Sequence, residues 1–116
     1  MTVRRLKTYA SVQGYVYQYY FVGQRAVPAA PGTEYVFDVT SDRQTTYPVS
    51  IILPEEVVTA WNQVHGRELS APEQYAAVKL RLFRAMDDME EPIRRACRLE
   101  LHSDELHQAL AALKIE

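Results

Sequence analysis

The chain of 116 residues has the length of one small domain and a formal net charge of −2. Its apolar fraction of 47% and charged fraction of 24% are typical of a globular protein and argue against a disordered chain or a membrane protein. No apolar run of the length that a secretory signal needs lies near the N-terminus, so we expect a cytoplasmic address. The single cysteine, Cys97, excludes an intramolecular disulfide, and we interpret it as a small buried hydrophobic residue.

Four of the eight tyrosines lie in one strand-length run between Gly14 and Gly23. Aromatic and β-branched residues favour strands, in which alternate side chains point to opposite faces. One face would carry Tyr15, Tyr17, Tyr19 and Phe21. The other face would carry Val16, Gln18, Tyr20 and Val22. Because both faces would be largely apolar, the run predicts a central strand or a strand covered by a partner.

A loop rich in proline and glycine at residues 26–32 ends the aromatic run, and further strands are expected after it. Residues 33–40 and 45–53 alternate between apolar and polar side chains, which predicts a hairpin in which Pro48 marks an edge or a strand start. Apolar and polar residues also alternate within residues 3–12, but only a weak turn follows them. The sequence therefore does not decide whether this segment forms a strand.

The second half of the chain has helical periodicity. Pro54 at a first helical position and Gly66 after the last apolar residue delimit a first helix. Ser70 and Glu73 have the spacing of a capping box and predict the start of a longer second helix. Ser103 is expected to cap a terminal helix.

These elements predict one α+β domain over residues 1–116, sheet-rich over 1–53 and helix-rich over 54–116. We expect an antiparallel sheet of three to four strands, an N-terminal meander, packed against two to three helices. Residues 93–101 fit a strand slightly better than a helix.

No motif points to a catalytic residue, a metal ligand set or a cofactor, so we expect none and favour a protein that is not an enzyme. The spacing of Cys97, His102 and His107 does not match a zinc site. An acidic cluster is the only basis for a third hypothesis, a metal-dependent hydrolase, and a solvated charged surface explains that cluster more simply. Its members are Asp87, Asp88, Glu90 and Glu91.

The favoured function is a small regulatory protein, an inhibitor or adaptor, that contacts a protein partner or a second copy of itself, with a homodimer expected. The alternative is a module for single-stranded nucleic acid, in which tyrosines stack on bases and nearby cations hold phosphates. Both hypotheses use the same candidate binding residues of the first strand and its surroundings. These are Tyr15, Tyr17, Tyr19, Tyr20, Arg4, Arg5, Lys7 and Arg25.

Overall fold

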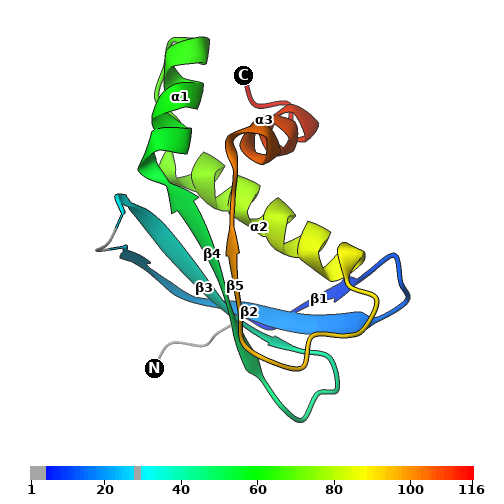
Figure 1. The fold of residues 1–116 in the computed structure, drawn as a ribbon. Coiled ribbons are helices and arrows are strands. Elements are labelled where there is room, and N and C mark those ends of the chain that lie inside the picture. Colours follow the sequence, from blue (N-terminus) through cyan, green and yellow to red (C-terminus); the bar gives the residue numbers. More distant parts are fainter. Residues whose placement is uncertain (1–4, 28–29) are drawn as a thin grey trace.

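A computed structural model describes residues 5–27 and 30–116, which form five strands and three helices (Figure 1). In chain order they are β1 (Lys7–Ala10), β2 (Val16–Ala26), β3 (Gly32–Thr40), β4 (Tyr47–Pro54), α1 (Glu55–His65), α2 (Ala71–Asp88), β5 (Cys97–Glu100) and α3 (Ser103–Ala112). The expected α+β class is confirmed. Within the described residues, no helix is both long and apolar enough to cross a membrane.

The sheet has the strand order β1-β2-β3-β4-β5, with antiparallel pairing through β4 and parallel pairing between β4 and β5. The expectation of a purely antiparallel sheet of three to four strands was therefore wrong. Both weakly patterned segments form short strands, at Lys7–Ala10 and Cys97–Glu100. Two helices separate β4 from β5, and such a crossover allows the chain to re-enter the sheet in the direction of β4.

All three helices contribute to one core on a single face of the sheet, and Figure 1 shows α2 lying across the strands. Cross-strand pairs on this face include Tyr19 with Val39 and Phe37 with Val49. The buried helical residues are Val57 and Trp61 of α1, Ala77, Val78, Leu82, Ala85 and Met86 of α2, and Leu106 and Leu110 of α3. The opposite face of the sheet, which we call the helix-free face, contributes no residue to the buried core cluster.

A β-bulge in β2 shifts its register against β3 between Phe21 and Gly23. Phe21 pairs with Phe37, and Gly23 pairs with Val36, so the intervening residue has no partner in β3. A bulge of this kind bends a strand and increases its twist. Its consequence for the surface is that Arg25 lies directly beside Glu34.

The helix boundaries follow the expected signals with small shifts. Pro54 is the residue before α1, and Gly66 ends the helix with a φ of 68°, a left-handed conformation that glycine adopts without strain. The capping box of Ser70 and Glu73 is confirmed at the start of α2. Helix α3 begins at Ser103 itself, and the Glu105 carboxylate accepts a hydrogen bond from the backbone N–H of His102 at 3.0 Å.

Candidate functional site

Two of the candidate tyrosines lie in the hydrophobic core beneath the helices. Tyr17 has no exposed surface, and its hydroxyl oxygen accepts a hydrogen bond from the backbone N–H of Ile93 at 3.3 Å. Tyr19 is 4% exposed, and its ring meets the rings of Phe37 and Phe83 edge to face. Burial raises the pKa of both phenols. These two rings contribute to the stability of the fold, and their faces are not presented at the surface.

The other two candidate tyrosines lie apart from each other. Tyr15 is half-buried and donates a hydrogen bond to the backbone carbonyl of Glu90 at 2.7 Å, which ties the start of β2 to the segment after α2. Tyr20 lies on the helix-free face and donates to the Asp38 carboxylate at 2.7 Å. The four tyrosines therefore do not form one surface, because alternation along β2 divides them between two faces.

The basic candidates separate in the same way. Arg25 lies on the helix-free face and pairs with Glu34, with 2.6 Å between Nε and Oε1. Lys7 pairs with Tyr19 of β2, and Arg5 and Lys7 line a small pocket with Tyr19 and Tyr20. Arg4 lies outside the described residues.

The helix-free face contains a charged network that runs across the strands. Glu34 is only 5% exposed, although no helix covers it. The hydrogen bond from Arg25 holds the pKa of Glu34 below its usual value despite burial, and Ser50 and the charge of Arg98 act in the same direction. A carboxylate kept charged at this depth depends on those donors.

Apolar side chains lie on the same face as this network. Val16 is 47% exposed and Val22 is 40% exposed, while Val36 and Ile52 are half-buried. Beside Ile52, at the junction of β4 and α1, the surface forms a groove of about 630 Å³. Its lining consists of Val27, Ala30, Pro31, Ile52, Pro54, Glu55, Glu56, Thr59, Arg98 and Glu100. The face thus combines exposed apolar groups with charges of both signs.

The pocket beside Arg5 and Lys7 has a volume of about 220 Å³ and a largely aromatic lining. Phe21 and Tyr75 complete it. The ammonium group of Lys79 lies 5.9 Å from the ring centres of both Tyr19 and Tyr75. Reasoning from the sequence grouped the β1 and β2 residues but missed the two from α2. Their spacing of four residues, which places them on one helix face, was the available signal.

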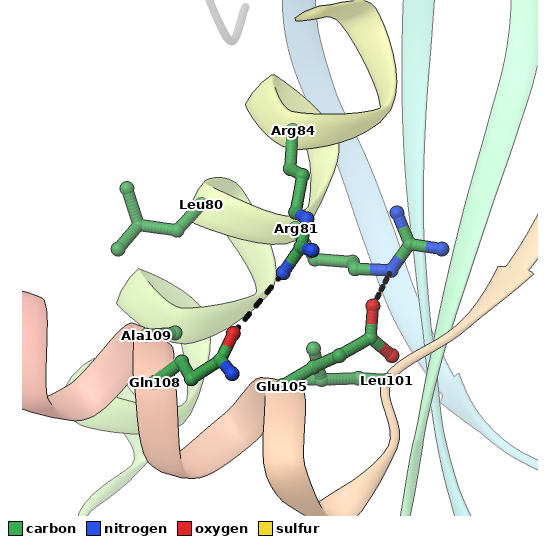
Figure 2. Close-up of a pocket in the computed structure, with 7 residues that line it drawn as sticks. All are labelled: Leu80, Arg81, Arg84, Leu101, Glu105, Gln108 and Ala109. Atoms are coloured by element: carbon green, nitrogen blue, oxygen red, sulfur yellow. Dashed lines mark hydrogen bonds and ion pairs between the residues drawn. The ribbon is translucent and has the colours of Figure 1, made fainter. Parts of the chain in front are cut away.

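A third pocket, of about 170 Å³, lies between α2 and α3 (Figure 2). Figure 2 shows Arg81 directed toward Glu105, with 3.2 Å between Nε and Oε2, and Arg84 directed toward Gln108, also at 3.2 Å. These polar groups are paired with each other across the two helices. The arrangement is that of a helix–helix contact rather than a ligand site.

Asp87 and Asp88 of the acidic cluster take part in local structural contacts. Asp87 accepts hydrogen bonds from the Tyr9 hydroxyl at 2.8 Å and from the Val12 backbone N–H at 3.0 Å. Arg84 lies one helical turn before Asp88, and its Nε is 3.9 Å from the Asp88 carboxylate. Within residues 5–27 and 30–116, no group of three or more His, Cys, Asp or Glu residues could hold a metal ion.

The sequence led us to expect a fully buried Cys97. Its side chain is only half-buried, because β5 forms an edge of the sheet. Its side chain packs against the core cluster, on the same face as Leu99.

Comparisons with protein-family models, with curated proteins and with solved structures found no match to this chain. The case for a function therefore comes from the surfaces described above.

Proposed function

We propose that the chain is a non-catalytic regulatory protein that binds protein through the helix-free face of its sheet, and that a second copy of the chain is the partner. The observation that carries this proposal is the one-sided packing of the fold. All three helices pack on one face, and the other face retains exposed apolar groups at Val16 and Val22. A sheet face that no helix covers and that carries exposed apolar groups supports a protein interface.

The surface differs from the tyrosine-rich one expected from the sequence. Tyr17 and Tyr19 are in the core, so the binding face retains Tyr20 and Arg25 together with the apolar groups around them. Tyrosine and arginine are both enriched at interfaces, where each adds a large contact area and hydrogen bonds.

Charge complementarity favours a second copy. The face carries Arg25 and Arg98 as well as Glu34 and Glu100, so its charges are mixed in sign. In a two-fold dimer the same surface of each copy faces that of the other in reverse orientation. This can bring arginines of one copy opposite glutamates of the other. A surface of one sign would oppose such pairing.

The size of the face approaches that of a standard interface. The five strands have 4, 11, 9, 8 and 4 residues, and at about 3.3 Å per residue and about 4.8 Å between strands they give a footprint of about 570 Å². A standard interface buries about 800 Å² of accessible surface on each partner. Because side chains roughen the face, its accessible area exceeds its footprint.

Sedimentation equilibrium at micromolar concentration tests the proposal. We expect the mass of a dimer for the natural chain and the mass of a monomer for Val16→Lys and Ile52→Lys, because each places a charge within the contact. The matched control is Val64→Lys, since Val64 is 73% exposed on α1, away from the sheet. Circular dichroism melting establishes that each variant is folded.

A monomeric mass for the natural chain would refute self-association. Equal dimerisation of Val16→Lys, Ile52→Lys and Val64→Lys would show that a different surface forms the contact.

A further inference from the structure

We infer that the pocket between β1 and α2 binds a phosphate group, held by Arg5, Lys7 and Lys79 against an aromatic wall. Tyr20 of the helix-free face also lines this pocket, but the three cations argued to hold the phosphate are not part of the proposed dimer contact, so the inference does not depend on the dimer. The ligand would be a small molecule that carries a phosphate group, or the phosphate-bearing end of a polymer.

The position of the lysines follows from the register of the hairpin and the periodicity of the helix. Lys7 of β1 is paired with Tyr19 of β2, so its side chain lies on the face that α2 covers. On α2, Tyr75, Lys79 and Phe83 are spaced four residues apart and therefore share a helix face. Phe83 stacks on Tyr9 of β1, which places Lys79 one turn earlier, beside Lys7.

The ammonium group of Lys79 is surrounded by rings rather than by acids. It lies 5.9 Å from the ring centres of Tyr19, Tyr75 and Phe83. Cation–π attraction supports one positive charge in this position. Within the described part of the chain, neither lysine has a carboxylate within ion-pair distance, and neither has Arg5.

Two ammonium groups that face each other without an acid repel, and this repulsion is greater where water is partly excluded. Burial and the nearby Lys7 ammonium lower the pKa of Lys79. An anion between the two lysines would replace the missing carboxylate. The repulsion between the two ammonium groups thus raises the free energy of the unliganded state, and a bound anion would relieve that repulsion.

Phosphate fits the site better than a carboxylate does. Arg5 and Lys7 line the pocket, and the Lys79 ammonium group lies 5.9 Å from the ring centres of Tyr19 and Tyr75 in its wall. Three cations match a dianion, and lysine is a frequent phosphate ligand in proteins. The volume of about 220 Å³ accepts a phosphate group with part of an attached ring. Phe21 and Tyr75, both half-buried, would contact that ring.

Titration followed by ¹H–¹⁵N correlation spectra tests the inference, at constant ionic strength maintained with chloride. The probes are inorganic phosphate, adenosine monophosphate and a short oligothymidylate. We expect saturable shifts of the backbone signals of Lys7, Tyr19 and Lys79 with at least one probe. Tighter binding of the monophosphate assigns a small ligand, and tighter binding of the oligothymidylate assigns a nucleic acid as the source of the phosphate.

The double variant Lys7→Gln/Lys79→Met removes both charges while retaining an apolar stem against the rings. It should weaken binding by about tenfold or more, given the strength of charge-assisted contacts to phosphate. The matched control is Lys114→Gln, an exposed lysine after α3 that does not line the pocket, and it should bind as the natural chain does.

Because the double variant relieves repulsion, it should fold at least as stably as the natural chain, so loss of binding would not reflect unfolding. Absence of saturable shifts with all three probes would overturn the inference. Equal affinity of the double variant and the natural chain would overturn it as well. Neither result would bear on the proposed dimer, which the sedimentation experiment tests separately.

Discussion

Tyr9 and Phe83 stack with their ring centres 4.3 Å apart and their planes inclined by only 4°. This contact joins the edge strand β1 to helix α2 across 74 residues of sequence, and the hydrogen bond from the Tyr9 hydroxyl to Asp87 reinforces it at 2.8 Å. An edge strand of four residues has few ladder hydrogen bonds of its own. Its attachment to α2 therefore depends largely on these two side-chain contacts.

The variant Tyr9→Phe retains the stacked ring and removes the hydroxyl. We expect the free energy of unfolding to fall by about 1 kcal/mol, the usual net value of one partly exposed hydrogen bond. Urea denaturation measures the change. The matched control is Tyr47→Phe, because the described residues provide no hydrogen-bond partner for the Tyr47 hydroxyl. Equal stability of the two variants would mean that the bond to Asp87 contributes nothing.

The ionisation of Tyr9 gives a second prediction. Burial, and then the hydrogen bond and charge of Asp87, raise the pKa of Tyr9 from 10.0 to about 12. A raised pKa means that the folded state favours the neutral phenol, so the associated stability is complete below pH 10 and is lost as pH rises through about 12. Absorbance titration of the natural chain minus Tyr9→Phe isolates this group. In Asp87→Asn its midpoint should move toward 10, and an unchanged midpoint would exclude Asp87 as a cause.

Local patterns in the sequence predicted most of the elements. The hairpin of residues 33–53 and the capping box of Ser70 and Glu73 depend on neighbours within a few positions, which a single sequence displays. The strand at Cys97–Glu100 was also predicted, but not its parallel pairing. Strand direction depends on how the two helices before it cross the sheet, and no local residue encodes that path.

The candidate site was predicted less well for the same reason. Period-two alternation correctly separated Tyr19 from Tyr20, but it could not show which face α2 would cover. Once that face is known, Tyr19 belongs to the core and Tyr20 to the surface. The proximity of Lys7 and Lys79 is likewise a tertiary fact, since the two lysines lie in different elements far apart in the sequence.

Glu73 supports the start of α2 through its charge, which gives a pH-dependent prediction. Its carboxylate accepts hydrogen bonds from Arg67, at 2.9 and 3.0 Å, and from the backbone N–H of Ser70 at 2.9 Å. These contacts, chiefly those from Arg67, lower the pKa of Glu73 from 4.5 to about 2. A lowered pKa stabilises the fold above pH 4.5, and that stability is lost as pH falls through about 2.

The variant Glu73→Gln should therefore melt at a lower temperature than the natural chain at neutral pH, and the difference should shrink as pH falls from 4.5 toward 2. Glu68→Gln, a change at an exposed neighbouring carboxylate, provides the control and should show little difference at any pH. A difference for Glu73→Gln that is constant with pH would show that the charge of this carboxylate does not act as described.

Gly32 allows a close approach between β3 and β4, where the chain turns from the sheet into α1. A Cβ atom at Gly32 would lie 2.9 Å from the backbone oxygen of Leu53 and 3.1 Å from the Cα of Pro54. Both are backbone atoms within the paired strands, so they cannot move without disturbing the ladder. We expect Gly32→Ala to lower the free energy of unfolding by about 1–3 kcal/mol, the range for overpacking.

The matched control is Gly23→Ala at the bulge in β2, where an added Cβ would meet nothing within 4 Å. Since neither glycine has a positive φ, the two variants differ mainly in the space around the added methyl group. Urea denaturation should show little loss for Gly23→Ala. Because the lower entropy of the unfolded chain favours both variants alike, equal changes in stability would show that contact with Leu53 and Pro54 does not determine the effect. A selective loss at Gly32 would instead establish that close packing of β3 on β4 positions the start of α1, where the Glu55 N–H donates to the Pro31 carbonyl at 2.9 Å.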